Sequence, residues 1–378
     1  MADAKTMLFN QMINDFADNE VKPLAAEVDE LERFPAETVA KMAKLGLMGI
    51  VVPAQYGGAG GDYPMYISAV EQISKRCATT GVILSAHTSL CIAPILENGT
   101  EEQKRKYLPD LASGKKLGAF GLTEPNAGTD ASNQQTVAVE KDDCYIINGS
   151  KIFITNGGYA DTYVVIAVTG KLPKGVEMTA FILEKGMDGF TFGKKEKKMG
   201  IRGSSTCELI FKDVRVPKEN MLGKRGEGFK IAMKALDGGR IGIAAQALGI
   251  AEGALEETIA YVKERKQFGK PISAFQNTQF RIADMATEIE AAKALVYIAA
   301  NAKQNKLPTV SVNAAQAKLF AAETAMKVTT QAVQLHGGYG YTREYPVERM
   351  MRDAKITEIY EGTSEVQRMV ISGALLRK

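Results

Sequence analysis

The sequence predicts an α+β protein in which helices come first, a β-rich segment follows and helices return at the end. Three observations support this order. Apolar residues recur at helical spacing up to about residue 113, short runs rich in Val, Ile, Thr, Tyr and Phe begin near residue 116, and Ala-rich stretches follow residue 217. We therefore expect three domains, over residues 1–116, 117–222 and 223–378.

The amino-terminal domain is predicted to be α-helical. Phe9, Met12, Ile13 and Phe16 recur at three- and four-residue spacing, which places them on one face of a helix. The Gly-rich run over residues 53–64 interrupts the helical pattern and is typical of a connection between helices.

The middle segment is predicted to be a central antiparallel β domain. Asn148-Gly149 lies between apolar runs within residues 145–154 and can adopt the positive φ angles of a two-residue turn, which predicts a β-hairpin. Three further strands are predicted at residues 163–169, 179–184 and 208–211.

The carboxy-terminal domain is predicted to be a four-helix bundle. Helical periodicity covers residues 241–266, 279–301 and 311–335, whose lengths suit long antiparallel helices. Ser364 and Gln367 have the spacing of a capping box, which predicts the start of a last helix.

Composition and charge exclude several classes of protein. The 378 residues include 47 Lys and Arg against 44 Asp and Glu, and a formal charge of +3 is too small to indicate a nucleic-acid partner. We find no signal peptide in residues 1–19 and no uninterrupted run of 18 apolar residues, so we expect no membrane span. Four scattered cysteines without a C-x-x-C pair are typical of free thiols in a reducing compartment, which predicts a cytoplasmic protein.

Several kinds of catalytic site are disfavoured by spacing. The sequence contains neither a G-x-G-x-x-G that follows a strand nor a G-x-x-x-x-G-K-[ST] motif, so a site for NAD or a nucleotide phosphate of these types is not expected. His87 and His336 are the only histidines, and no G-x-S-x-G or H-E-x-x-H motif occurs. We therefore expect neither a metal site nor a Ser-His-Asp triad.

Three junctions rich in Gly and Thr remain as candidate sites, at residues 120–130, 334–340 and 359–368. Each has a purely structural interpretation as well: a turn, a glycine that ends a helix, and the cap of the last helix. Within the third junction, Glu361 precedes a helix start and is followed by Gly362, so its carboxylate can project into a cleft. A glutamate in such a place can act as a general base if an apolar environment tunes its pKa.

Taken in order, these junctions resemble the acyl-CoA dehydrogenase family, and the similarity covers essentially the whole chain. The branch that it resembles most is the short-chain, butyryl-CoA dehydrogenase type of anaerobic bacteria. Further motifs that carry the resemblance are Phe153–Gly158, Met199–Arg202, Leu236–Ile243, Arg265–Gly269, Tyr345–Met351 and Arg352–Ile356.

The resemblance implies FAD as the cofactor, held between the β domain and the carboxy-terminal helices and reached by a neighbouring subunit of a homotetramer, a dimer of dimers. An electron-transferring flavoprotein is the implied electron partner. The residues implied to contact FAD are Phe120, Leu122, Thr123, Gly128, Thr129, Phe153, Ile154, Thr155, Arg265, Phe268, Gln276, Gln334, Gly337, Gly338, Thr363, Ser364 and Glu365.

For the substrate, the resemblance implies α,β-dehydrogenation of a short-chain acyl-CoA, or the reverse reduction of an enoyl-CoA, with Glu361 as the base that removes the α-proton. The implied CoA thioester contacts are Thr129, Asp237, Arg240 and Gly362, while Tyr360 borders the acyl site as pocket wall or as packing. Arg240 could pair with CoA or with a neighbouring carboxylate.

The acyl group is the open question. Residues 89–96 occupy the expected pocket floor, and the small Ala93 would admit a longer or an aromatic enoyl group. We expect a C4 to C6 preference, with an aryl-enoyl-CoA or acryloyl-CoA reductase as the alternative. An acyl-CoA oxidase and a non-enzymatic, DNA-associated flavoprotein are further alternatives on the same fold.

Overall fold

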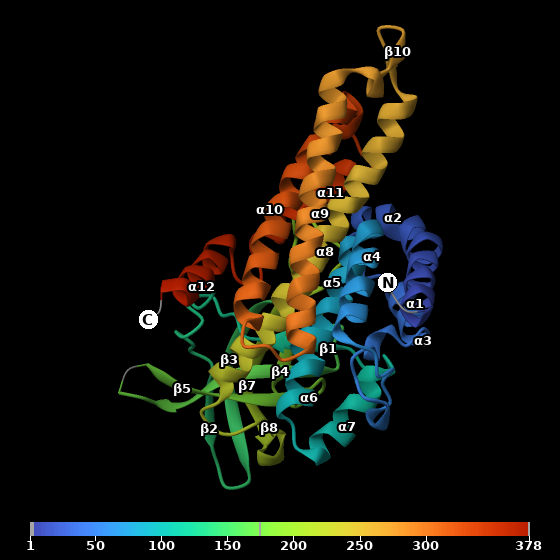
Figure 1. Ribbon diagram of the computed structural model, residues 1–378. Coiled ribbons are helices and arrows are strands. Elements are labelled where there is room, and N and C mark those ends of the chain that lie inside the picture. Colours follow the sequence, from blue (N-terminus) through green and yellow to red (C-terminus); the bar gives the residue numbers. More distant parts are fainter. Residues whose placement is uncertain (1–3, 174, 377–378) are drawn as a thin grey trace.

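A computed structural model describes residues 4–173 and 175–376, and its amino-terminal part is helical, as predicted (Figure 1). Asp62 caps one long helix, because its Oδ1 accepts a hydrogen bond from Met65 N at 2.8 Å. Thr100 and Gln103 form a capping box at the start of another. The helices are α1 (Ala4–Phe16), α2 (Ala25–Glu30), α3 (Ala36–Lys44), α4 (Tyr63–Arg76), α5 (Ala78–Ala86), α6 (Ala93–Asn98) and α7 (Glu101–Ala112), with a π-helical turn, η5 (His87–Ile92), between α5 and α6.

The middle segment forms one eight-stranded sheet in the order β6-β7-β3-β2-β4-β5-β8, and β1 pairs with β4. The predicted β domain is confirmed, and most of its pairings are antiparallel. Two pairings, β1 with β4 and β2 with β4, are parallel, which the antiparallel prediction did not include. The strands are β1 (Gly118–Gly121), β2 (Val137–Glu140), β3 (Cys144–Thr155), β4 (Thr162–Lys171), β5 (Val176–Glu184), β6 (Phe190–Lys195), β7 (Thr206–Pro217) and β8 (Met221–Leu222).

The hairpin predicted at Asn148-Gly149 is wrong, because both residues lie inside the continuous strand β3. The register of β3 against β7 shifts between Ile147 and Gly149, so the Asn-Gly pair forms an irregularity in a strand instead of a turn. The φ of Gly149 is 138°, and a Cβ there would lie 2.7 Å from Thr136 Cα. Asn148 exchanges hydrogen bonds of 2.8 and 3.0 Å with Asp213 on β7, which ties the two strands together at this point.

Long helices form the carboxy-terminal part, as predicted, and they run side by side from the sheet to the opposite end of the molecule (Figure 1). A small β9–β10 hairpin at that far end joins α8 to α9, and we call this end the bundle tip. Helix α12 packs across α10, and α4 packs against α8. The elements are α8 (Gly228–Glu264), β9 (Lys266–Gln267), β10 (Lys270–Pro271), α9 (Gln276–Gln304), α10 (Val310–His336), α11 (Val347–Ile356) and α12 (Ser364–Leu376).

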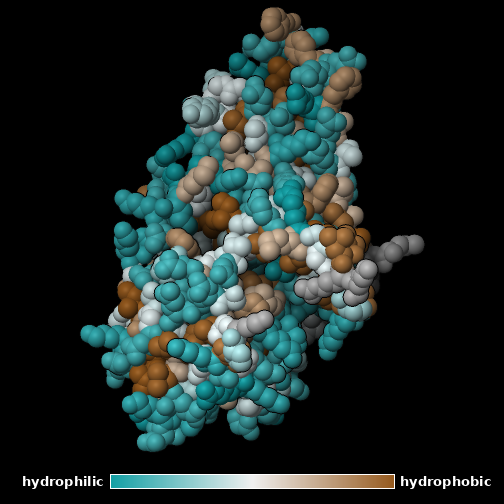
Figure 2. Space-filling model, turned by 90° about the vertical axis from the view of Figure 1, so that its left-hand side faces the viewer, coloured by the Kyte–Doolittle hydropathy of each residue, from teal (hydrophilic) through white to brown (hydrophobic). Residues whose placement is uncertain are grey.

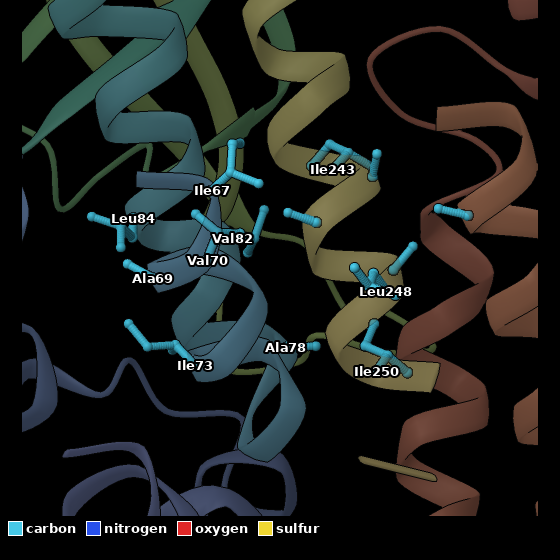
Figure 3. Close-up of a cluster of buried hydrophobic side chains, with 14 of the residues drawn as sticks. Ile67, Ala69, Val70, Ile73, Ala78, Val82, Leu84, Ile243, Leu248 and Ile250 are labelled. Carbon is cyan, nitrogen blue, oxygen red and sulfur yellow. The ribbon is translucent and has the colours of Figure 1, made fainter. Parts of the chain in front are cut away.

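The core joins the two helical parts of the chain. Ile67 and Val70 on α4 pack in one buried cluster with Ile243 and Leu248 on α8, as Figure 3 shows. A second cluster lies between the sheet and helices α5 to α8, and a third lies within the β domain. A site at the junction of sheet and bundle is therefore held by rigid elements from all three parts.

The helical run from Ala78 to Asn98 is long and apolar enough to cross a membrane by composition. However, 89% of its most apolar window is buried inside the molecule, as expected for a core helix. The four cysteines are free and buried.

Candidate active site

Glu361 lies on the short segment between α11 and α12, and its backbone is held in an uncommon conformation. Its φ is 53° and that of Gly362 is 90°, both in the left-handed region that a glutamate rarely adopts. Such a conformation persists only where neighbouring contacts fix it. Here, Gly362 O accepts hydrogen bonds from Lys318 Nζ at 2.7 Å and from Gln367 Nε2 at 2.8 Å.

The carboxylate of Glu361 is turned toward helix α8. A Cβ added to Gly239 would lie 1.6 Å from Glu361 Oε2, so only glycine leaves room for the carboxylate at this point of the helix. Oε2 is buried and has no hydrogen-bond partner among the described residues. Burial raises the pKa of Glu361 to about 8, and the nearby charges of Lys318 and Arg240 oppose that rise. The group is thus poised to exchange a proton near neutral pH.

Asp237 and Arg240 lie one turn apart on α8, beside Glu361. Arg240 Nη1 donates to Asp237 Oδ1 at 2.8 Å, and Ser311 Oγ donates to the same oxygen at 3.0 Å. Arg240 therefore pairs with a neighbouring carboxylate, which is one of the two arrangements expected from the sequence. Its buried Nε has no hydrogen-bond partner among the described residues, so one donor remains available to a ligand.

Two tyrosines of α4, Tyr63 and Tyr66, line this region on the side of α4. Tyr63 OH donates to Gly238 O at 3.0 Å, and Tyr66 OH donates to Ser85 O at 3.2 Å. Burial raises the pKa of both phenols, and the charge of Glu361 adds to the rise. Both rings therefore remain neutral near the carboxylate.

Tyr360 and the expected pocket floor border the same region. Tyr360 OH donates to Gln246 Oε1 on α8, and this hydrogen bond of the phenol group fixes the ring. The first residues of the expected floor belong to the buried π-helical turn η5, and Ser89 Oγ donates to Ser85 O at 2.7 Å. A Cβ on Gly238 would lie 3.8 Å from Ser89 Cβ, which places η5 directly beside α8.

The predicted cofactor residues of the β domain meet at the end of the sheet. Phe120 and Leu122 are buried, and Ile152 N donates to Thr123 O at 2.8 Å, so the first junction lies beside the end of β3. Phe153 has a φ of 57° and is 61% exposed. Ile154, next to it, is buried and Thr155 is half-buried, while Gly128 and Thr129 lie on an exposed part of the loop that follows.

A buried ion pair holds that loop against β3. Lys151 Nζ donates to Glu124 Oε1 at 2.6 Å and to Leu122 O at 3.2 Å, and it also contacts Gln134 Oε1. Glu124 in turn accepts from the backbone N–H of Thr136 at 3.0 Å. Lys151 thus fixes both ends of the segment that carries the first junction.

Six further predicted cofactor residues form a second group at the bundle tip, far from the sheet in Figure 1. Arg265 lies over the ring of Tyr339, at 5.5 Å from its centroid, which joins the tip to the end of α10. Phe268 is 94% exposed. Within one chain the two groups are not brought together. The members of the tip group are Arg265, Phe268, Gln276, Gln334, Gly337 and Gly338.

The start of α12 differs from the predicted capping box. Thr363 Oγ1 accepts from Val366 N at 3.4 Å, so Thr363, instead of Ser364, caps the helix. Ser364 Oγ is buried without a hydrogen-bond partner among the described residues, and Gln367 Nε2 reaches back to the carbonyls of Glu361 and Gly362. Glu365, which follows, is exposed.

Sequence patterns gave no role to three residues around Glu361: Lys318, Gly239 and Gln246. One signal was present for Lys318. It interrupts a stripe of alanines at helical spacing, including Ala314 and Ala321, and a lysine on such a stripe must find a buried partner.

Three family models match the chain in order along its length. Residues 3–115 match the acyl-CoA dehydrogenase N-terminal domain, residues 119–214 the middle domain and residues 226–376 the C-terminal domain. Short-chain specific acyl-CoA dehydrogenase of Clostridium acetobutylicum is 65% identical over 98% of this chain and 97% of the relative. Acryloyl-CoA reductase (NADH) of Anaerotignum propionicum is 50% identical over 98% of this chain and 94% of the relative.

Solved structures agree with these relatives. A chain in the structure described as the electron transferring flavoprotein of Acidaminococcus fermentans is 58% identical, with a TM-score of 0.98 over 100% of this chain and 99% of its own. Butyryl-CoA dehydrogenase of Megasphaera elsdenii is 56% identical, with a TM-score of 0.97 over 100% of this chain and 99% of its own. An acyl-CoA dehydrogenase of Bacillus anthracis, solved with FAD, is 35% identical, with a TM-score of 0.94 over 100% of this chain and 69% of its own.

Proposed function

The chain belongs to the acyl-CoA dehydrogenase family, and from this premise we propose that it interconverts short-chain acyl-CoA and 2-enoyl-CoA thioesters with Glu361 as the base. One observation carries the assignment of the base. The Glu361 carboxylate is turned onto Gly239, with a buried oxygen that has no hydrogen-bond partner among the described residues and a pKa raised by burial to about 8.

The residues present fit FAD, the cofactor of this family. Polar atoms stay buried and unpaired within the described residues at Ser364 Oγ and Gln367 Oε1, at the start of α12, where backbone N–H groups favour a phosphate. A Cβ on Gly128 or on Gly338 would meet only open space, which leaves room for a ligand against the backbone. When bound, FAD supplies the acceptor for the hydride that leaves the substrate β-carbon.

Each residue of the chain has a defined task in this proposal. Glu361 takes the α-proton, because its raised pKa is close to the working pH. The backbone N–H of Glu361 donates to the thioester carbonyl and stabilises the charge that develops on its oxygen. Tyr63 and Tyr66 exclude water from the carboxylate, and Arg240 keeps one donor for the CoA thioester.

The similar chain in the Acidaminococcus structure supports an electron-transferring flavoprotein as the partner that exchanges electrons with the reduced cofactor. The relative from Anaerotignum supports reduction of a C3 enoyl thioester as a second candidate on the same site. Both reactions use the same residues in opposite directions.

We also propose a homotetramer in the cytoplasm. Apolar side chains stay exposed on α9, α10 and α12, as Figure 2 shows for the face that carries α12, and such faces are typical of subunit contacts. Examples are Phe280, Ile298 and Met369. The four free, buried cysteines suit a reducing compartment.

Anaerobic titration of the flavin-loaded protein with butyryl-CoA tests the proposal. We expect bleaching of the flavin absorption in the wild type, almost none in Glu361→Gln, and wild-type bleaching in Glu358→Gln. Glu358 is a suitable control because its carboxylate pairs with Lys355 on the same segment. Equal bleaching in wild type and Glu361→Gln would remove Glu361 from its role.

Substrate turnover separates the candidates. Acyl-CoA thioesters from C3 to C12, acryloyl-CoA and cinnamoyl-type thioesters should give highest turnover at C4 to C6. A maximum beyond C8 or on an aryl substrate would overturn the short-chain assignment. Fast reoxidation of the reduced flavin by oxygen without any partner would instead indicate an oxidase.

A further inference from the structure

Lys318 is a buried lysine that is not accounted for by the reaction described above. It lies on α10 between the buried alanines Ala314 and Ala321, and its side chain is fully buried. A buried ammonium group is retained only with a partner, because desolvation penalises the charge. The partner is a backbone carbonyl, since Lys318 Nζ donates to Gly362 O at 2.7 Å.

This hydrogen bond acts on the Gly362–Thr363 peptide group, one residue beyond Glu361. Gly362 O is the acceptor, and the two residues on either side of the Glu361–Gly362 peptide have φ angles of 53° and 90°. Gln367 Nε2 donates to the same carbonyl from α12, so two donors from two helices hold one oxygen. The contact thereby fixes the left-handed backbone that turns Glu361 toward Gly239.

Burial raises the pKa of Glu361, and among the nearby charges that of Lys318 opposes this rise most strongly. Burial lowers the pKa of Lys318 to about 8, so the ammonium form predominates at pH 7, and Glu361 opposes this decrease. Arg240 is already paired with Asp237. The titratable groups that face Lys318 and Glu361 are Asp237 and Arg240 on α8, Tyr63 and Tyr66 on α4, and Glu358, Tyr360 and Glu365 beside Glu361.

We propose that Lys318 is a positioning residue for Glu361, one that fixes the direction of its carboxylate through the Gly362 carbonyl and favours its ionised form through its charge. The inference rests on the proposed role of Glu361 as the base. It predicts two separable effects, one on geometry and one on proton affinity, because Gln367 shares the first role but carries no charge.

The test is the pH dependence of flavin reduction by butyryl-CoA in the flavin-loaded enzyme. In Lys318→Met, we expect the acid limb of the reduction rate to move up by about one pH unit, so that reduction at pH 7 falls about tenfold. Gln367→Leu should slow reduction without moving the limb, because it removes a hydrogen bond and leaves the charge. Lys318→Gln, which is neutral but polar, should show the same shift as Lys318→Met and replaces it if that variant does not fold.

Lys293→Met is the matched control. Lys293 is a partly buried lysine of the same bundle that pairs with Glu71 and Glu252, so its loss should lower stability and leave the acid limb in place. The ionisation of Glu361 can also be followed without turnover, as the infrared carboxyl band that Glu361→Gln removes. Its midpoint should rise in both Lys318 variants.

The outcomes separate the inference from the function. An unshifted acid limb and infrared midpoint in the Lys318 variants would overturn the role of Lys318, while Glu361→Gln still abolishes reduction. Failure of the wild type to reduce its flavin with any acyl-CoA would instead overturn the proposed function.

Discussion

The Glu361 carboxylate has a pKa well above its ordinary value, so we expect the proposed reaction to depend on pH. Because burial raises its pKa to about 8, the wild-type rate of flavin reduction by butyryl-CoA should rise with pH and level off above about pH 8. Stopped-flow measurement from pH 6 to 9.5 checks this. A rate that is flat across the range would show that another step, or another group, controls reduction.

The same carboxylate links stability to pH. A folded-state pKa raised from 4.5 to about 8 means that the folded protein binds more protons than the unfolded chain in this window, so its stability falls as pH rises through it. Glu361→Gln removes the titration. Its stability relative to the wild type should therefore increase between pH 4.5 and 8, by about 1–3 kcal/mol, since partial exposure of the residue reduces the full effect. Urea denaturation at several pH values measures the difference, and a constant difference would contradict the raised pKa.

Substitution of Gly239 is expected to slow flavin reduction strongly. A Cβ at this position would lie 1.6 Å from Glu361 Oε2, so Gly239→Ala must displace the carboxylate. A displacement of about 1 Å costs roughly 100-fold in rate, and we expect that loss in flavin reduction. Gly373→Ala is the control, because a Cβ there meets open space on α12. Near-normal reduction in Gly239→Ala would show that Glu361 takes another position during the reaction.

Sequence reasoning singled out Glu361, the proposed base, but missed residues that surround it and hold its backbone. Glu361 is visible because it stands in a Gly- and Thr-rich junction at a helix start. Gly239 and Lys318 act from other helices, and their roles depend on how α8 and α10 pack against the 359–363 segment. That packing is set by the core that the helices share, which no local pattern encodes.

The loop that carries the first junction depends on one ion pair with β3. Replacing Lys151 by Met leaves Glu124 buried without its cation, and breaking such a pair costs about 3 kcal/mol. We expect Lys151→Met to be destabilised by this amount in urea and to release FAD more readily, because the loop loses its anchor. Lys212→Met, at an exposed position of β7, should change neither property. Unchanged FAD affinity in Lys151→Met would show that the loop is held by other contacts.

Strand β3 shows why local signals can mislead. Asn-Gly has the same preference for positive φ in a bulge as in a hairpin turn, so the pair alone does not distinguish them. Pairing with β7 distinguishes them here, because Asp213 accepts a hydrogen bond from Asn148 Nδ2 and its backbone N–H donates one to Asn148 Oδ1. The long helices were predicted well because their periodicity extends over many turns, whereas Thr363 instead of Ser364 caps α12 because of one local hydrogen bond.

At the scale of the whole molecule, the residues expected to contact FAD are not all brought together within one chain. Apart from those at the start of α12, the residues expected to contact FAD lie in two groups, one at the end of the sheet and one at the bundle tip, and Figure 1 shows these at opposite ends of the long helices. Phe268 at the tip is 94% exposed, which is unusual for an aromatic residue without a partner surface. Both facts are explained if the tip of one copy completes the site of another.

Mixing two inactive variants tests this arrangement directly. Glu361→Gln lacks the base, and Arg265→Glu alters the tip, so each should be inactive alone. When the two are co-expressed, a mixed pair contains one site with an intact base from the Arg265→Glu chain and an intact tip from the Glu361→Gln chain. Random pairing makes half of the pairs mixed, so about a quarter of wild-type activity should return. If the tip served its own chain, both sites of a mixed pair would stay broken and co-expression would restore nothing.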